Sequence, residues 1–200
     1  MITNKNYVEQ YKLLNDKNKL YYESNLSIFN MVNEISLFID YLKPKNILDY
    51  GCGNGVLLKL LKHNYTKINI DGYDPAIKEF SVIPNNHYDM IINTDVLEHI
   101  PKSDIADVLN HIKSLSNNVF FCLHHGKAWT ILPNGENAHI TIEPKEWYHN
   151  LMKKYFDIII PLNARNPINS IVITFNINKS IFHKYNKILK LDINDNLQIK

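Results

Sequence analysis

The segment from Ile47 to Gly55 constrains this chain more than any other, because an apolar run leads into an acid and then into spaced glycines. The glycines stand at positions 51, 53 and 55, and the apolar-rich stretch from Val56 reads as the first turns of a helix. Glycine permits tight turns and a close approach of the backbone to a ligand. The pattern predicts a strand that delivers a glycine-rich loop to a helix N-terminus, which is the usual way to hold a nucleotide-like ligand.

The spacing of this loop separates it from the dinucleotide-binding fingerprint. It reads G-x-G-x-G, whereas dinucleotide folds carry G-x-G-x-x-G. Asp49 precedes the first glycine, and a carboxylate at that place would repel a pyrophosphate. A carboxylate accepts hydrogen bonds from a cationic or hydroxyl-bearing ligand, so we expect a ligand of that kind.

Four segments together resemble the class I S-adenosylmethionine (SAM) dependent methyltransferases. Residues 48–55 resemble the first motif of that family, and Gly72–Ala76 resembles the acidic end of its second strand. Tyr88–Ile100 resembles the fourth strand and its following loop, in the form common in the small-molecule, type 11/12-like branch. Leu132–His139 is similar to a segment of a bacterial and phage subgroup. The resemblance covers roughly residues 45–160.

The alternation of strand and helix patterns indicates an α/β fold, and the resemblance implies a Rossmann-like three-layer sandwich. We expect a mostly parallel sheet of six to seven strands with an antiparallel last strand. Only fourteen residues, 75–88, separate the second strand from the fourth. A parallel crossover alone needs about a dozen residues. The third strand is therefore expected to be shortened to 80–83 or missing, with adenine held near 75–83 and 94–96.

The expected organisation is a single globular unit with three parts: a helical cap at 1–44, a SAM-binding domain at 45–176 and a C-terminal extension at 177–200. Apolar spacing of three and four predicts a helix from residue 28 to near Pro44. Further helices are expected at 54–63, at 103–115 with Ser103 as its cap, and after Pro144. The expected strands are 46–50, 68–73, 88–93, 119–123, 156–160 and 170–176.

The resemblance implies SAM as the cofactor and assigns its contacts residue by residue. Asp49 is expected to anchor the amino acid end of SAM, and Asp74 to accept both ribose hydroxyls. Asp95 either approaches the methionine part of SAM or a substrate amine, or caps a helix around 96–100. The expected cofactor-binding residues are Asp49, Tyr50, Gly51, Cys52, Gly53, Gly55, Asp74, Pro75, Thr94, Asp95, Val96 and His99.

The segment 124–143 is the longest expected loop, and loops of that length in compact domains are usually functional. It leaves the fifth strand at the ligand edge, so we expect it to close over the acceptor and, in its free form, to be mobile or held by a partner chain. His139 and His125 are its candidate catalytic residues; His139 acts as a base or is a buried structural histidine. The spacing of His124, His125 and His139 fits no metal-ligand pattern, so no metal is expected.

The amino-acid composition indicates which classes of partner and which cellular location to expect. The net charge is +2 and no basic stripe carries interleaved aromatics, which favours a small-molecule acceptor over nucleic acid. Cys52 and Cys122 form neither a metal pair nor a disulfide framework, which is typical of a reducing cytosol. No apolar run has the length of a membrane span, and the N-terminus lacks a signal-peptide core. We expect a cytoplasmic monomer or homodimer.

The expected function is methyl transfer from SAM to an oxygen or nitrogen atom of a small molecule. Two alternatives share the same cofactor motifs. One is an enzyme that uses SAM without methyl transfer, such as a SAM lyase. The other is a non-catalytic module that binds SAM-like ligands or a protein partner. Only methyl transfer yields S-adenosylhomocysteine, so the product separates these possibilities.

Overall fold

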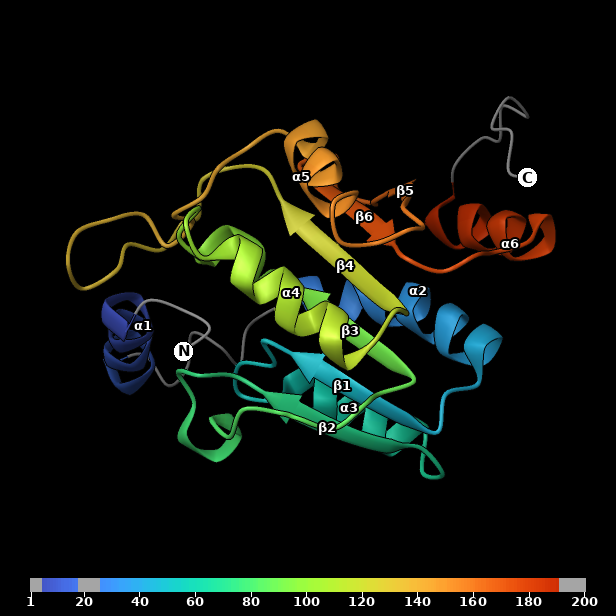
Figure 1. Ribbon diagram of the computed structural model, residues 1–200, viewed down its shortest axis with the longest axis horizontal. Helices are drawn as coiled ribbons and strands as arrows, with labels where there is room; N and C mark the ends of the chain where they lie inside the picture. The colour runs from blue at the N-terminus through green and yellow to red at the C-terminus, as the bar shows by residue number, and fades with distance from the viewer. Residues whose placement is uncertain (1–4, 18–25, 191–200) are drawn as a thin grey trace.

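The computed structural model describes residues 5–17 and 26–190, and the described chain is built around one six-stranded sheet (Figure 1). The strand order is β2-β1-β3-β4-β6-β5. Strands β1 to β4 pair in parallel, and β6 runs antiparallel to both of its neighbours. This confirms the expected mostly parallel sheet with an antiparallel last strand. The strands are β1 (Asn46–Tyr50), β2 (Asn69–Tyr73), β3 (Met90–Thr94), β4 (Val119–His124), β5 (Ile160–Asn163) and β6 (Asn169–Ile173).

The link between β2 and β3 is too short for another strand, as its length predicted. It holds only a 3₁₀ turn, η1 (Lys78–Phe80), so β2 forms the edge of the sheet. The amide of Asp74 donates to the carbonyl of Phe80 at 3.0 Å, which folds the link back toward the end of β2. The Phe80 ring then lies so close to Gly55 that an added Cβ there would meet it at 3.0 Å.

Alternate residues of each strand face opposite layers. On one face, side chains such as Ile47 and Ile92 join a buried cluster with α2 (Leu26–Leu42), α3 (Val56–Asn64) and α6 (Lys179–Leu189). On the other face, residues such as Leu48 and Ile91 pack with α4 (Ile105–Leu115) and α5 (Lys145–Met152). Figure 1 shows these two helical layers on either side of the sheet, which confirms the three-layer sandwich.

Two boundary predictions are wrong. The strand expected at 156–160 is β5 at Ile160–Asn163, because its register is set by pairing with β6. Helix α4 is not capped by Ser103; it begins at Ile105, with Asp104 in the cap position and no side-chain cap bond. The amide of Asp104 donates to the carbonyl of Pro101, so a turn is completed before the helix starts. Ser103 donates to the Asp104 carboxylate instead.

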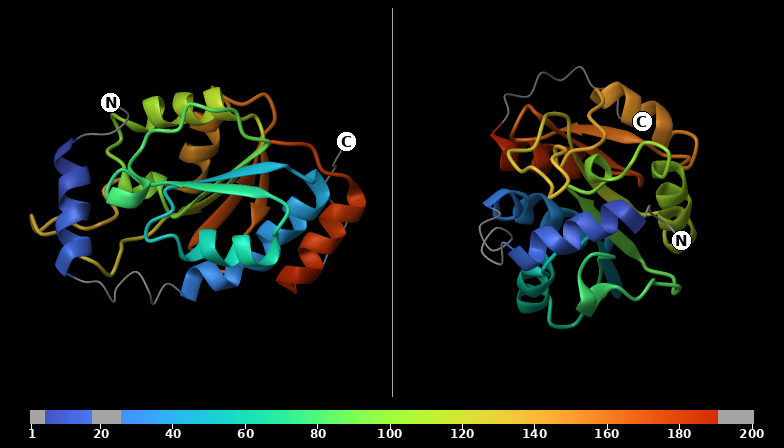
Figure 2. Two further views of the ribbon diagram at one scale, coloured as in Figure 1. Left: turned by 90° about the horizontal axis from the view of Figure 1, so that it is seen from below. Right: turned by 90° about the vertical axis from the view of Figure 1, so that its left-hand side faces the viewer.

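The two ends of the described chain pack in different ways. Helix α6 lies against α2 and buries Tyr185 and Leu189, so its described part completes the core; residues 191–200 of the expected extension lie outside the described residues. Helix α1 (Lys5–Lys17) stands apart from the sheet, beside the loop that follows β4 (Figures 1 and 2). Its Leu14 packs against Leu132 and Ala138 of that loop. Within residues 5–17 and 26–190, no helix has the length and apolar character needed to cross a bilayer.

Candidate functional site

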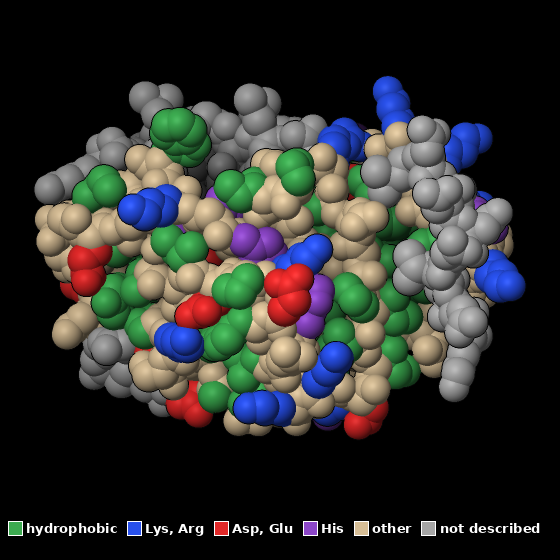
Figure 3. All heavy atoms as spheres, turned by 90° about the horizontal axis from the view of Figure 1, so that it is seen from above, with side chains coloured by type: hydrophobic (Ala, Val, Ile, Leu, Met, Phe, Trp, Pro, Cys, Tyr) green, Lys and Arg blue, Asp and Glu red, His purple; other side chains and the backbone are tan. Residues whose placement is uncertain are grey.

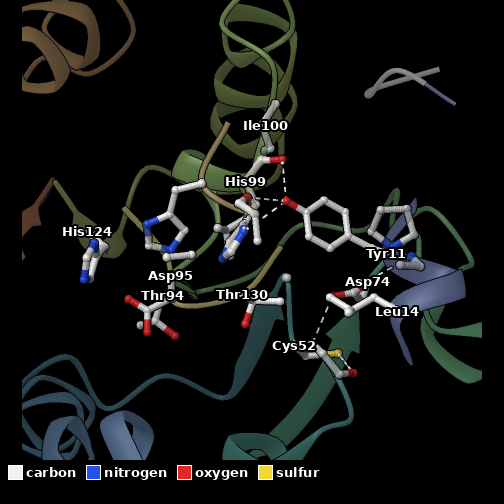
Figure 4. Close-up of a pocket in the computed structure, with 18 of the residues that line it drawn as sticks. Tyr11, Leu14, Cys52, Asp74, Thr94, Asp95, His99, Ile100, His124 and Thr130 are labelled. Carbon is white, nitrogen blue, oxygen red and sulfur yellow. Dashed lines mark hydrogen bonds between the residues drawn. The ribbon is translucent and has the colours of Figure 1, made fainter. Parts of the chain in front are cut away.

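A cavity of about 420 Å³ lies at the carboxyl ends of the parallel strands, where open α/β sheets bind ligands. The glycine loop, the end of β2 and the end of β3 form one part of it. The segment after β4, the turn before β6 and helix α1 form the rest. Figure 4 shows the lining spread from Cys52 and Asp74 at one end to His124 at the other.

The glycine loop needs glycine for two different reasons. Gly51, Gly53 and Gly55 have φ angles of 88°, 50° and 72°, in the left-handed region that favours glycine. At Gly51 an added Cβ would also lie 2.3 Å from a methyl carbon of Val96, so the loop fits tightly against the end of β3. Gly51 and Gly53 line the cavity. Gly55 does not line it; this glycine occupies the N-cap position of α3.

The backbone amides of the loop are already used within the protein. Those of Gly51 and Cys52 donate to the carbonyl of Tyr73, at 2.6 and 3.1 Å. The amide of Gly53 donates to the Asp74 carboxylate at 3.0 Å, and that of Gly55 to the carbonyl of Cys52. These four groups are therefore not free to bind phosphate oxygens, which agrees with a ligand other than a dinucleotide.

Asp49 is a buried carboxylate of the cavity lining, and one of its oxygens lacks a hydrogen-bond partner among the described residues. Its side chain is 2% exposed, and its Oδ2 has no hydrogen-bond partner in the described part of the chain. Burial, followed by the nearby Asp74, raises the pKa of Asp49 to about 7. A buried oxygen without a partner is costly, and a ligand ammonium group would satisfy it.

Asp74 holds the loop and keeps capacity for a ligand. Its Oδ2 accepts from the Gly53 amide and its Oδ1 from the Ala76 amide, at 3.0 and 2.9 Å. Each carboxylate oxygen has two lone pairs, so each keeps one for a ribose hydroxyl. Burial raises the pKa of Asp74, and the backbone hydrogen bonds oppose that shift. Asp74 therefore caps the turn, and binding of the ribose hydroxyls to it stays a prediction.

The remaining predicted cofactor residues gather at the same cavity. Of the segment 75–83, only Pro75 and Ala76 line it. Tyr50 lines it, but its hydroxyl lies 3.0 Å from His111 Nδ1, on the side of α4. Asp95 has a φ of 54°, a left-handed conformation that is uncommon for a residue with a side chain. The predicted residues that line the cavity are Asp49, Tyr50, Gly51, Cys52, Gly53, Asp74, Pro75, Thr94, Asp95, Val96 and His99.

His139 reaches the cavity with one ring nitrogen engaged. Its Nδ1 lies 2.6 Å from the carbonyl oxygen of Gly126. A carbonyl only accepts, so Nδ1 carries the proton and Nε2 keeps its lone pair. The ring packs edge-on between His124 and His99, with centroids 4.6 and 4.8 Å away. Burial lowers the pKa of His139, which favours the neutral form that acts as a base.

His125 lies outside the cavity lining, unlike His139. Its Nδ1 lies 3.1 Å from the carbonyl of Glu143, and its Nε2 lies 2.7 Å from the Ser170 hydroxyl. One ring nitrogen therefore joins the two ends of the loop, and the other ties the loop to β6. The structure brings His139 and the cofactor residues together and places His125 in a supporting position.

Helix α1 supplies lining residues that the sequence did not single out for the site. The Tyr11 hydroxyl donates to the carbonyl of Ala138 at 2.5 Å and lies 3.1 Å from His99 Nδ1 (Figure 4). The loop is thus covered by a helix of the same chain. The spacing of Tyr7, Tyr11 and Leu14 fits one helix face, which is the signal in the sequence that could have found this surface. The full set from α1 is Tyr7, Val8, Tyr11, Leu14 and Asn15.

A family model described as "Methyltransferase domain" matches residues 29–155. The match covers more than half of the chain, so this protein belongs to that family, the class I SAM-dependent methyltransferases. The chain thus carries a methyltransferase domain of the SAM-dependent class, in which SAM is the cofactor. No protein of curated function matches the sequence.

Solved structures agree on the fold at low sequence identity. The 1,6-didemethyltoxoflavin-N1-methyltransferase of Burkholderia thailandensis, solved with S-adenosylhomocysteine, is 10% identical with a TM-score of 0.57 over 83% of this chain and 85% of that one. The magnesium protoporphyrin IX methyltransferase of Synechocystis PCC 6803, solved with SAM, is 13% identical with a TM-score of 0.54 over 82% and 95%. An O-methyltransferase family protein of Burkholderia thailandensis is 12% identical with a TM-score of 0.52 over 72% of this chain. Here the match spans only 57% of the longer relative.

Proposed function

We propose that this methyltransferase transfers the methyl group of SAM to an oxygen or nitrogen atom of a small-molecule acceptor. The observation that carries the proposal is the open Nε2 of His139 in a cavity covered by α1. A neutral imidazole with a free lone pair suits a nucleophile that must lose a proton. A covered cavity of about 420 Å³ suits a compact acceptor.

The end of the cavity near the glycine loop is assigned to SAM. The Oδ2 of Asp49 accepts hydrogen bonds from the ammonium group of the ligand, and Asp74 accepts from the ribose hydroxyls. Pro75, Ala76 and Val96 flank the adenine in place of the missing third strand. Bound SAM supplies an activated methyl group on a sulfonium.

The other residues position the acceptor and remove its proton. His139 Nε2 takes the proton of the nucleophile, and Nδ1 stays fixed by Gly126. Helix α1 and the loop 124–143 exclude water from the reacting atoms, which strengthens polar contacts there. In this arrangement residues 5–17 act as the cover of the site, whereas α2 belongs to the core.

A small acceptor is also favoured by the charges on the surface. On the face shown in Figure 3, acidic and basic side chains are interspersed, and no single-sign patch suited to nucleic acid is seen there. The structural neighbour from Burkholderia thailandensis was solved with a small heterocycle, 1,6-didemethyltoxoflavin, in addition to S-adenosylhomocysteine. That neighbour shows that a related fold accommodates a compact acceptor beside the cofactor product.

The test uses SAM with an isotopically labelled methyl group, incubated with the protein and a metabolite extract. We expect S-adenosylhomocysteine and a labelled small molecule, identified by mass spectrometry. His139→Ala should keep SAM affinity within a few-fold and lower turnover by about 10²–10⁴, the usual span for a general base. The matched control is His63→Ala, an exposed histidine of α3. SAM cleavage without S-adenosylhomocysteine would show a lyase, and labelled RNA or protein would contradict a small acceptor.

A further inference from the structure

The half of the cavity left for the acceptor is defined by the elements that the cofactor does not use. It is formed by the end of β4, the start of β6 and the loop 124–143. His124 lines it: its strand register pairs it with Asn169, and its ring packs against that of His139 at 4.6 Å. Asn169 and His139 are therefore both neighbours of His124, and both line the cavity.

Asn169 and His139 each carry an atom that can accept a hydrogen bond. The Oδ1 of Asn169 is buried and has no hydrogen-bond partner in the described part of the chain. The Nε2 of His139 keeps its lone pair, because Nδ1 donates to Gly126. A ligand must bring O–H or N–H groups to satisfy two such acceptors. A carboxylate brings none and would be repelled by both atoms.

The charges around this half favour a neutral ligand. Lys127 lines the cavity on this side and would repel a cationic amine. Glu98 lies buried beneath the loop, and burial followed by the nearby Asp95 raises its pKa well above the ordinary value. Its Oε1 accepts a hydrogen bond from the His124 amide, so Glu98 is engaged beneath the loop, and the lining carries Asp95 as well as Lys127, two side chains of opposite formal charge. Hydroxyl groups satisfy the same acceptors without a net charge.

The rim supplies an apolar platform. Trp129 lines the cavity, and its side chain is fully exposed. Ile168, which is 41% exposed, packs beside Gly126 in the same region. Since the cavity lies at the lower end of the roughly 300–1,000 Å³ typical of ligand pockets and must also hold SAM, the acceptor extends past the rim onto such a platform. A ring with an apolar face fits the flat indole of Trp129.

We propose that the acceptor is an uncharged ring compound with two adjacent hydroxyl groups, held through Asn169 and His139 with its ring on Trp129. This inference rests on the proposed function. One hydroxyl donates to Asn169 Oδ1 and the other to His139 Nε2. The second oxygen forms a bond to the methyl carbon as the carbon–sulfur bond breaks, and the electron pair of that bond stays on sulfur. The hydroxyl proton passes to His139 Nε2, so the products are a methyl ether and S-adenosylhomocysteine.

The experiment uses Trp129 as its own reporter. The chain has two tryptophans, so Trp147→Phe leaves Trp129 as the only one. This variant is saturated with S-adenosylhomocysteine and titrated with catechol, methyl glucopyranoside, phenethylamine and benzoate, while its fluorescence is recorded. We expect a saturable change with at least one diol, and the two diols distinguish an aromatic acceptor from a sugar. The matched control, 1,2-dimethoxybenzene, has the ring without the hydroxyls and should give a weaker response.

Substitutions at Asn169 test the proposed contact. Asn169→Leu should weaken diol binding about three- to tenfold, the loss of one neutral hydrogen bond, whereas Asn169→Asp keeps the acceptor oxygen and should retain binding. The inference is overturned if neither diol gives a saturable response, if phenethylamine or benzoate binds more tightly, or if Asn169→Leu binds the diol unchanged. S-adenosylhomocysteine affinity, measured separately by calorimetry, should be the same in all variants. If the parent protein does not bind S-adenosylhomocysteine, the proposed function is overturned instead.

Discussion

The carboxylate of Glu98 accepts a hydrogen bond from the amide of His124 at 3.0 Å. The main-chain carbonyl of the same residue accepts from the amides of Ile140 and Thr141, at 2.8 and 3.0 Å. One residue of η2 (Leu97–His99) thus ties both ends of the loop 124–143 together. These hydrogen bonds fix the position of His139, because they hold the loop that carries it at both of its ends.

Replacing the Glu98 carboxyl by an amide should therefore keep the fold stable, whereas truncating the side chain should destabilise it. Glu98→Gln keeps an oxygen for the His124 amide, so its free energy of unfolding should stay near that of the parent. Glu98→Ala leaves that buried amide unpaired and should cost about 1–3 kcal/mol. Denaturant unfolding with both variants measures the difference. Equal losses in the two variants would contradict the hydrogen-bonding role.

The pH dependence of stability gives a second readout of Glu98. Its pKa in the folded protein is raised by burial and by Asp95. The folded state therefore binds the proton more tightly than the unfolded state, and the stabilisation from this group is full below the ordinary pKa of 4.5. It is lost as the pH rises through the folded value. Glu98→Gln should remove this part of the decline, which unfolding curves at several pH values above 4.5 will show.

The close approach of Gly51 to Val96 should matter more than the backbone conformation of the glycine. Gly51→Ala brings a Cβ to 2.3 Å from Val96 and should abolish detectable SAM binding. Gly135→Ala is the matched control, because Gly135 also has a positive φ, of 89°, but an added Cβ would meet nothing within 4 Å. Both variants should lose about 1 kcal/mol or more of stability through backbone strain. Calorimetry should show that Gly135→Ala binds SAM normally.

The steric interpretation of Gly51 can be tested by rescue. Val96→Ala removes both methyl groups that the new Cβ would meet and should restore part of the SAM affinity in the Gly51→Ala background. If the double variant binds no better than Gly51→Ala alone, backbone strain rather than the contact with Val96 limits binding.

Ligand binding should be linked to the proton on Asp49. Burial and Asp74 raise the pKa of Asp49 from its ordinary 3.8 to about 7, so the carboxyl is largely neutral below that pH and ionised above it. An ammonium group binds the ionised form better. SAM affinity should therefore rise as the pH increases through about 7, and binding near that pH should release a proton. Calorimetry in buffers of different ionisation enthalpy measures the release, which Asp49→Asn should eliminate.

The parts predicted well from sequence are those set by local patterns. Residues 46–50 lie between a turn and spaced glycines, so β1 and the glycine turn after it were predicted correctly. The missing third strand followed from the length of 75–88 alone. The strand β5 was misplaced, because the apolar run 158–160 resembles a strand while the real pairing includes Pro161. Proline is tolerated there since β5 is an edge strand, and only the contact with β6 fixes its register.

The candidate site shows the same division between local and long-range information. The residues next to His125 and His139 in the sequence do not show which of the two side chains points into the cavity. Their hydrogen-bond partners, Ser170 and Gly126, are distant in the sequence and are brought close only by folding. Gly55 was assigned to the ligand from its spacing, yet its neighbour Phe80 comes from the shortened link after β2. The spacing of Tyr7, Tyr11 and Leu14 fits one face of a helix, but nothing in it indicates that this face covers the cavity.

Tyr11 should hold this cover in place. Its hydroxyl donates to the carbonyl of Ala138 and contacts His99, so it joins α1 to the loop and to η2. Tyr11→Phe removes these hydrogen bonds and keeps the ring, which packs edge-on against His99 at 5.4 Å. The amides of residues 5–17 should then exchange hydrogen faster, and SAM should dissociate faster while its association rate changes less. Hydrogen exchange with mass spectrometry and stopped-flow binding measure the two effects. The matched control is Tyr155→Phe, a partly buried tyrosine packed near α5 and far along the chain from the cover. If both variants release SAM at the parent rate, α1 does not control access to the cavity.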